Sequence, residues 1–488
     1  MSTGADNLDD DPGTRVNWLD RGGILAKAFR MTKDAETETK SPPAPSPTLD
    51  LAGHAFYLLV EDAGRELSAR LLMAIQLAER GAEVWIGQQL WFAANFPALK
   101  PGVALFKGMN MPQVANMRAA RLAGHRTAVI DEELFGLTDT SGKRLHDHRA
   151  ARHCDLFLAE GEHQRRFLER DLGVPSDQIT VSGNPRVDLL RPPLDGAMER
   201  AAGPPRARMG PFILVNTNFG AINPHDQDAF NYFRRCVAIQ AVDPTAPDSM
   251  RNFHDLCAFE TSNLRAISSF IAETRRLAPD RKIVVRPHPA ENPNIWREAH
   301  AGDSQVVIIE DNRHLAWIRA ADAMVHTSCT TGLEGYLLGA RVIGLVPDPD
   351  SPWSRRYLSN KVGEIHTDPK TAARALAESH AAQGARTDQI QDHLRVNPNE
   401  MASKSVVRAL GRLSQNVAPT QQRVHLGAPF RPFRANQRQL DQLSVDEAEV
   451  GNRLNALRDG LGIDTPCDIE TIDANVFRVF PASRNGRQ

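Results

Sequence analysis

The sequence predicts an α/β protein built from two parallel-sheet domains that follow one another along the chain. Three observations predict this fold class: short apolar segments alternate with amphipathic ones, the alternation stops at a stretch rich in Pro, Gly and Arg, and it then restarts. Strands that alternate with helices form parallel sheets with helices on both faces. A chain of 488 residues has room for two or three domains of ~100–200 residues each.

Residues 1–50 lack apolar periodicity and end in a Pro- and Ser-rich stretch, which predicts a disordered leader. The N-terminal domain is expected over 51–205. Its first strand is predicted at 56–60, and a helix follows over 65–80 with Gly81 as its stop. Further strands are predicted at 83–87, 103–107, 127–131, 155–161 and 179–184.

Residues 203–211 are rich in Gly, Pro and Arg and are interpreted as an interdomain linker. The C-terminal domain is expected over 211–415, with a long helix within 250–278. Its strands are predicted at 212–218, 282–288, 305–311, 323–328 and 341–348. Residues 416–488 are polar and are interpreted as a C-terminal extension of unknown role.

The composition and the charge argue against several classes of protein. Lys and Arg total 58 against 60 Asp and Glu, for a net charge of −2, whereas nucleic-acid-binding modules carry a basic excess. No run of ~18 apolar residues predicts a membrane helix, and the acidic first residues do not have the form of a secretory signal. The five scattered cysteines predict reduced thiols rather than disulfides or a zinc site. A cytoplasmic enzyme is expected.

In an open parallel sheet, ligands bind outside the carboxyl ends of the strands. One such end, at 326–334, reads HTSCTTGLE and combines hydroxyl groups with the start of a helix. Hydroxyls and free N–H groups at a helix N-terminus favour phosphate binding; ordinary N-capping is the alternative interpretation. The candidate donor-binding residues here are His326, Thr327, Ser328, Thr330, Thr331 and Glu334, whose carboxylate could accept a ribose hydroxyl.

The sequence RPHP at a second strand end supports the same interpretation. Arg286 and His288 are two residues apart, so their side chains project in the same direction. The prolines, including Pro289, stiffen the turn that holds them. A structural turn with a surface histidine is the alternative. Two strand ends suited to phosphate in one domain favour a binding site.

In the N-terminal domain, the acidic run Asp131, Glu132 and Glu133 follows an apolar strand. A partly buried member of this run would have a raised pKa, which suits proton abstraction from a hydroxyl; a solvated acidic turn is the alternative. Arg65 lies near a helix start, where a cation opposes the dipole. The substrate or Glu61 would explain it, unless it is a surface arginine.

Other polar residues at strand ends complete the expected site. These further cleft candidates are Glu61, Arg65, Lys107, Asn184, Arg186, Asn216 and Asn218. Two sheets whose polar strand ends face each other across a cleft are typical of a transferase with one domain for the donor and one for the acceptor.

The ordered series LVEDAGRELSARLLMAIQLAERG, VIDEEL, ITVSGNPRVDLL, ILVNTNF, IVVRPHP and HTSCTTGLEG resembles the bacterial surface carbohydrate biosynthesis protein family. That family is similar to GT-B glycosyltransferases and, more distantly, to Kdo transferases and CDP-glycerol glycerophosphotransferases. The resemblance spans residues 55–365, so it leaves out the leader and the C-terminal extension.

The resemblance implies a GT-B fold and metal-independent transfer from a nucleotide-activated donor, with no cofactor. It also implies that His288 and Pro289 contact the nucleotide, that Ser328, Thr330 and Thr331 take its phosphate, and that Asp131, Glu132 or Glu133 is the catalytic carboxylate. The family motif usually has glycine where this chain has Leu134, which reduces the backbone freedom of that turn.

The expected function is a glycosyltransferase that builds a bacterial surface polysaccharide, such as capsule or lipopolysaccharide, from a nucleotide sugar. A Kdo-like sugar on a CMP donor is one example, and the acceptor would be a glycan or a lipid-linked glycan. The alternatives are a CDP-polyol phosphotransferase, a non-catalytic component of a polysaccharide assembly complex, and a nucleotide-sugar epimerase. The expected location is cytoplasmic, with peripheral contact to the inner membrane or to assembly proteins.

Overall fold

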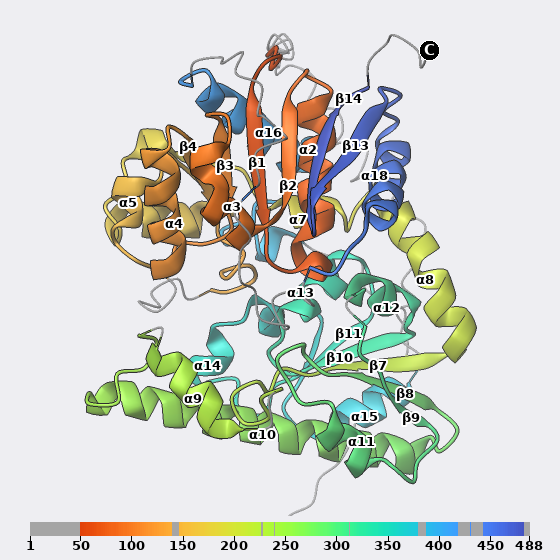
Figure 1. Cartoon of the computed structure of the whole chain (residues 1–488). Helices are drawn as coiled ribbons and strands as arrows, with labels where there is room; N and C mark the ends of the chain where they lie inside the picture. The colour runs from red at the N-terminus through yellow and green to blue at the C-terminus, as the bar shows by residue number, and fades with distance from the viewer. Residues whose placement is uncertain are drawn as a thin grey trace, which may run out of the picture. The chain divides into compact units, whose positions relative to one another are not determined.

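The computed structural model describes residues 49–138, 146–225, 228–238, 240–311, 313–378, 387–417, 430 and 443–482. The predicted leader lies outside this part of the chain except for its last two residues. The described residues belong to one compact unit that starts at Leu49. Two sheets organise this unit, and we call the parts built around them the N-lobe and the C-lobe (Figure 1).

The N-lobe sheet has the strand order β13-β14-β2-β1-β3-β4-β5-β6. The strands from β2 to β6 pair in parallel, as the alternation of strands and helices predicts. Their bounds are β1 Ala55–Val60, β2 Glu83–Gln88, β3 Val103–Phe106, β4 Arg126–Ile130, β5 Leu156–Ala159 and β6 Ile179–Val181.

Both faces of this sheet are covered, which explains why its strands read as unbroken apolar runs. Successive side chains of a strand point to opposite faces. Leu58 therefore packs in one core with α2 (Ser68–Ala78), and Tyr57 packs in the other with α3 (Gln89–Asn95) and α4 (Met111–Leu122).

The remaining helical segments of the N-lobe are short. They are η1 Ala63–Leu67, η2 Phe96–Ala98, α5 Ala150–His153, α6 Glu162–Arg170, η3 Ser176–Gln178 and α7 Pro185–Asp188.

The described part of the C-terminal extension belongs to the N-lobe, a role that sequence reasoning left open. Strands β13 (Cys467–Asp473) and β14 (Val476–Pro481) form an antiparallel hairpin, and β14 pairs with the edge of β2. Helices α16 (Ala402–Ser414) and α18 (Glu447–Leu461) lie against α2 (Figure 1). The chain therefore returns to the N-lobe before residue 402, and not at the expected boundary of 415.

The C-lobe sheet is parallel, with the strand order β12-β11-β10-β7-β8-β9. Its strands are β7 Phe212–Asn216, β8 Lys282–Arg286, β9 Val306–Ile308, β10 Ala323–His326, β11 Val342–Leu345 and β12 Glu364–His366. The two parallel-sheet lobes confirm the predicted fold class.

Helices cover both faces of this sheet as well. One face packs against α10 (Pro247–Leu277) and α15 (Pro369–Ala377), and the other against α8 (Asp195–Met209) and α12 (His314–Ala320). The remaining helical segments are α9 Ala229–Ala238, α11 Asn294–Ala299, α13 Thr330–Leu337, α14 Pro352–Arg355, η4 Leu358–Lys361 and η5 Thr387–Gln389. Among the described residues, no helix combines the length and the apolar character needed to cross a bilayer.

Most of residues 203–211, interpreted from the sequence as an interdomain linker, are helical in the structure. Helix α8 runs through to Met209 and contains Pro204 and Pro205. A proline inside a helix costs about 3 kcal/mol or more, so local propensity pointed away from a helix. Tertiary contacts offset that cost: Met209 packs in the C-lobe core, and Arg206 donates to the Ala320 carbonyl at 3.0 Å and to Asp322 at 2.6 Å.

Candidate functional site

A cavity of about 280 Å³ lies between the two lobes, where the carboxyl ends of their strands converge. Residues after β1 and β4 form its N-lobe wall, and residues after β8 and β10 form its C-lobe wall. The lining residues are Glu61, Asp62, Gly64, Arg65, Glu133, Arg186, Arg286, His288, Pro289, Ala290, His314, Cys329, Thr330, Thr331 and Glu334. The structure thus brings together most of the residues that the sequence singled out.

The N-lobe wall is an ion-pair network around Glu133. Lys107 Nζ, buried at the end of β3, lies 2.7 Å from Glu133 Oε1 and also contacts Glu61. Arg65 Nη2 lies 2.6 Å from Glu66, 3.5 Å from Glu133 and 3.6 Å from Glu61. These carboxylates compensate the charge of Arg65, which lies near a helix start where a cation opposes the helix dipole.

The network keeps Glu133 ionised. Burial by itself would raise the pKa of Glu133, but Lys107 and Arg65 outweigh it and lower the pKa to about 2. This is opposite to the raised pKa that the acidic run predicted. A carboxylate with so low a pKa is a weak base and suits electrostatic stabilisation better.

The three adjacent carboxylates of the acidic run have different surroundings. Asp131 is buried, with His146 Nε2 3.2 Å from its Oδ2 and the Glu133 amide bonded to its Oδ1. Glu132 is buried between Arg70, at 3.5 Å, and Arg186, at 3.4 Å. Of the three, Glu133 alone lines the cavity. The turn gives the three carboxylates different environments, and their adjacent positions in the sequence did not indicate which one would face the cavity.

The C-lobe wall carries a buried cation, Arg286, at the end of β8. Its Nε donates to the Asp311 carbonyl at 2.7 Å. Within the described residues, no carboxylate lies at salt-bridge distance from Arg286, and burial lowers its pKa. The group remains charged because free arginine titrates above pH 12. Asp311, Asp62 and Glu334 act on Arg286 only from beyond ion-pair distance. A buried cation that makes no direct ion pair is costly, so this wall suits an anionic ligand.

His288 lies in a turn that a buried carboxylate holds in place. Glu291 accepts hydrogen bonds from the His288 amide (3.0 Å), the Thr217 hydroxyl (2.6 Å) and Trp296 Nε1 (3.3 Å). The Ala290 amide donates to His288 Nδ1 at 3.1 Å, so a neutral His288 carries its proton on Nε2. Sequence reasoning missed Glu291, although its place three residues after His288 was a usable signal.

The Ser/Thr-rich loop divides into a part that lines the cavity and a part that is buried outside it. Thr330 and Thr331, the first residues of α13, line the cavity together with Cys329. The Thr331 hydroxyl accepts from Asn216 Nδ2 at 3.0 Å, which is how Asn216 supports the site. Ser328 lies outside the cavity: its φ is +52° and its hydroxyl accepts from Asn360.

The expectation that His326 and Thr327 face the donor was wrong, because both are buried in the C-lobe and outside the cavity lining. Burial lowers the pKa of His326 to about 4, and its ring fills the space beside Gly332, where an added Cβ would lie 2.3 Å from Nε2. His326 is a core residue, and the strand end turns toward solvent only after it.

Arg186 and Glu334 join the two lobes. Arg186 Nη2 donates to Glu334 Oε1 at 2.6 Å, and His314 Nε2 lies 3.0 Å from Oε2. The Arg186 guanidinium also stacks on Phe135 at 4.1 Å. Each oxygen of Glu334 thus has one partner from the protein, and Glu334 also lines the cavity.

Two other candidates support the fold and do not line the cavity. Asn184 accepts from the Arg186 amide at 2.9 Å and donates to Glu160 at 2.8 Å, so it caps α7 and orients Arg186. Asn218 is hydrogen-bonded to the half-buried Tyr357.

A second cavity of about 540 Å³ lies beside the first and shares Arg65, Arg186, His314 and Glu334 with it. Helix α18 contributes Glu449 and Arg453 to its lining. Sequence reasoning missed both residues because they lie in the extension, far along the chain from every strand-end motif. The extension thus forms part of the interlobe surface.

Acid should weaken the structure through Glu334. Burial would raise its pKa, but Arg186 and His314 lower it from an ordinary value of 4.5 to about 2. A lowered folded-state pKa gives stability that is present above pH 4.5 and lost as the pH falls toward 2. We expect Glu334→Gln to cost on the order of 3 kcal/mol at pH 7. In urea unfolding, this difference from wild type should shrink below pH 4.5; a constant difference would contradict the assignment.

The two lobes and the cavity at their facing strand ends define a GT-B-type α/β protein. Similar solved structures include UDP-GlcNAc 2-epimerase from Methanocaldococcus jannaschii in complex with UDP-GlcNAc and UDP (14% identity, 73% of this chain and 99% of that chain, TM-score 0.46). The Neisseria meningitidis UDP-GlcNAc 2-epimerase bound to UDP-GlcNAc is 13% identical, with 74% and 99% covered and a TM-score of 0.46.

The wall teichoic acid polymerase TagF is also similar, at 10% identity over 76% of this chain and 91% of that chain, with a TM-score of 0.41. No protein-family model matches the sequence, and no curated protein matches it. Likeness at this level does not by itself assign an activity.

Proposed function

We propose that the protein transfers a sugar from a nucleotide-activated donor to a glycan acceptor in bacterial surface polysaccharide synthesis. One observation carries this proposal: Arg286, which is buried and makes no direct ion pair within the described residues, lies in the same cavity as Thr330, Thr331 and His288. This set suits the phosphate of an activated donor. The polysaccharide context rests on the sequence resemblance.

Three kinds of group would hold the donor phosphate. Arg286 supplies charge, and charge-assisted hydrogen bonds are about twice as strong as neutral ones. The start of α13 supplies backbone N–H groups, a positive dipole end and the hydroxyls of Thr330 and Thr331. His288 supplies a proton on Nε2. Together these groups would neutralise the phosphate as it leaves.

The N-lobe wall would stabilise the sugar in the transition state. Glycosyl transfer develops positive charge on the sugar, as in the oxocarbenium-like transition state of glycoside hydrolysis. Glu133 faces the cavity as a permanent anion, since its pKa is about 2. We therefore assign Glu133 the electrostatic role, and Asp131 and Glu132 a supporting one beneath it.

The acceptor would enter through the second cavity. That cavity shares Arg65, Arg186, His314 and Glu334 with the first, so a ligand there would lie next to the donor. Its volume of about 540 Å³ is in the range of ~300–1,000 Å³ found for ligand pockets.

The same wall favours a second candidate, transfer of a polyol phosphate from a CDP donor. Arg286, His288 and Thr331 all lie where they could contact a migrating phosphoryl group. Incubation with a labelled donor and analysis of the product separates the two: a transferred phosphate would refute sugar transfer.

A nucleotide screen tests the donor class. We expect one nucleotide among CMP, CDP, UDP, GDP and ADP to raise the unfolding temperature selectively, because a ligand that binds only the folded state stabilises it, by ~2.7 kcal/mol at a hundred times its Kd. Cytidine nucleotides are expected for a Kdo-like donor, and stabilisation by UDP alone would refute that donor. If no nucleotide stabilises the protein, or if His288→Ala responds like wild type, the proposed site is wrong.

A further inference from the structure

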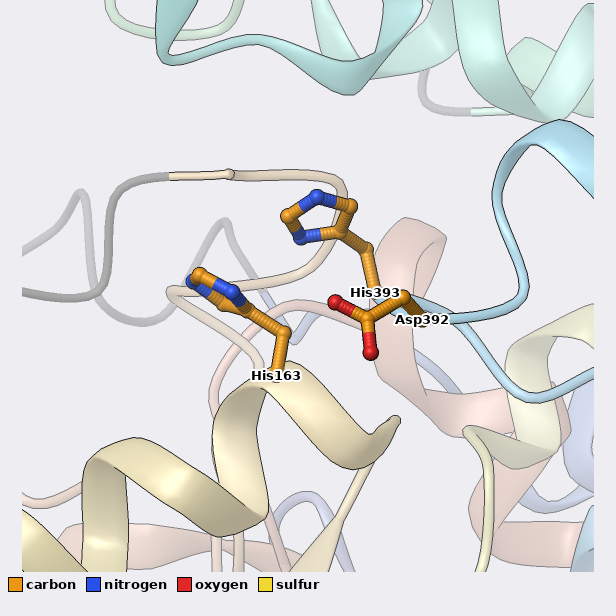
Figure 2. A group of neighbouring side chains, drawn as sticks. All are labelled: His163, Asp392 and His393. Atoms are coloured by element: carbon orange, nitrogen blue, oxygen red, sulfur yellow. The ribbon is translucent and has the colours of Figure 1, made fainter.

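We propose that His163, Asp392 and His393 form a binding site for a divalent transition-metal ion of the zinc class. Figure 2 shows the three side chains gathered between the start of α6 and the segment that follows η5. One ligand atom from each residue lies within 4.8 Å of the other two. None of the three lines either interlobe cavity, so this site is independent of the proposed transfer reaction.

The backbone holds the two ligand segments together before any ion binds. The His163 amide donates to the Asp392 carbonyl at 2.8 Å. Gly161 allows this approach, because an added Cβ there would lie 2.5 Å from the His393 carbonyl oxygen. The ligands therefore need only side-chain adjustment to close on an ion, and not a rearrangement of the chain.

The hydrogen bonding of the two imidazoles is compatible with metal binding. The ring of His163 is hydrogen-bonded to the Thr138 carbonyl, which leaves its second nitrogen as the acceptor, the usual arrangement of a metal-binding histidine. His393 Nδ1 is buried and has no hydrogen-bond partner among the described residues. An imidazole nitrogen that carries no proton and has no other hydrogen-bond partner can bind a metal ion.

The carboxylate completes a ligand set that zinc accepts, two imidazoles and one carboxylate with a position left open. Arg166 Nη2 binds Asp392 Oδ2 at 2.6 Å, so the other oxygen can face the ion. Arg166 and the nearby Lys361 are positive and oppose a cation. We therefore infer a site weaker than a closed four-ligand zinc site.

A bound ion would hold in place the segment through which the chain passes from the C-lobe back to the N-lobe. Asp392 and His393 lie between α15, which packs on the C-lobe sheet, and α16, which packs on the N-lobe. His163 belongs to α6 of the N-lobe. A bound ion would thus attach the returning segment to the N-lobe and stabilise the folded chain.

Zinc titration of the metal-free, full-length protein tests this site. We expect one Zn²⁺ per chain by calorimetry, a rise in unfolding temperature, and binding at least ~10-fold weaker in His163→Ala and His393→Ala. His300→Ala is the matched control, a half-buried histidine of the C-lobe, and it should bind like wild type.

Two further measurements separate lost ligands from lost folding. Co²⁺ bound to the wild-type protein should show a visible ligand-field spectrum that either alanine variant loses. Arg166→Gln removes an opposing charge and should bind Zn²⁺ more tightly than wild type. Absence of one-to-one binding in the wild type, equal binding by His393→Ala, or weaker binding by Arg166→Gln would each overturn the proposal.

Discussion

Arg286→Met should strongly reduce nucleotide-dependent stabilisation without destabilising the ligand-free protein. The side chain is buried, and within the described residues no carboxylate lies at ion-pair distance from it. Removing it deprives a bound phosphate of its buried cation, a loss of about 2–5 kcal/mol, which corresponds to roughly 30-fold weaker binding or more. In the empty protein, methionine removes a buried charge that makes no direct ion pair within the described residues, and it keeps most of the side-chain volume. Calorimetric titration and thermal unfolding measure the two effects.

Two control variants make this result specific. Arg286→Lys keeps the charge but loses the planar donor fork, so it should retain part of the binding. Arg297→Ala removes an exposed arginine of the same lobe that pairs with Glu310, and it should bind nucleotide like wild type. If Arg286→Met binds nucleotide normally, or unfolds well below the wild type, Arg286 is structural and the proposed phosphate site is wrong.

Arg186→Ala should produce the largest loss of stability. The substitution leaves Glu334 and Glu132 buried without this counter-charge, although Arg70 still pairs with Glu132. Breaking a buried ion pair by removing one partner costs about 3–5 kcal/mol. Urea unfolding followed by circular dichroism should show this loss as a lower midpoint.

A double variant separates charge from packing. Arg186→Met with Glu334→Gln removes the cation and its main partner together, so less uncompensated charge stays buried. It should therefore be more stable than Arg186→Met alone. A stability for Arg186→Ala within about 1 kcal/mol of wild type, the level of an exposed ion pair, would contradict the buried interlobe contact.

Sequence reasoning located the site through strand ends. Arg286, His288, Thr330 and Glu133 each follow an apolar run, and in a parallel sheet the carboxyl ends of the strands share one edge. These residues line the cavity for that reason. The rule that ligands bind at the carboxyl ends of strands also predicted that His326 contacts the ligand. That prediction failed because the rule gives the position at which a strand ends, and not the direction in which each side chain points.

Contacts between segments far apart in the chain explain the other differences. Glu133 lies 26 residues from Lys107, and that pairing reverses the pKa shift expected from burial. Arg186 meets Glu334 across 148 residues, and Arg453 comes from a helix in the polar extension. A pattern within a short stretch of sequence does not indicate ion pairs between residues so far apart in the chain.

The pattern of apolar residues alone was enough to predict both parallel sheets and the edges at which ligands would bind. Strands that are buried on both faces are short, continuous apolar runs, and such runs can be recognised in the sequence. It was not enough to define which carboxylate faces the cavity, which buried arginine makes no direct ion pair within the described residues, or where the described part of the C-terminal extension packs. Those properties depend on distances between residues remote in sequence, and these are set only when the helices and sheets pack together.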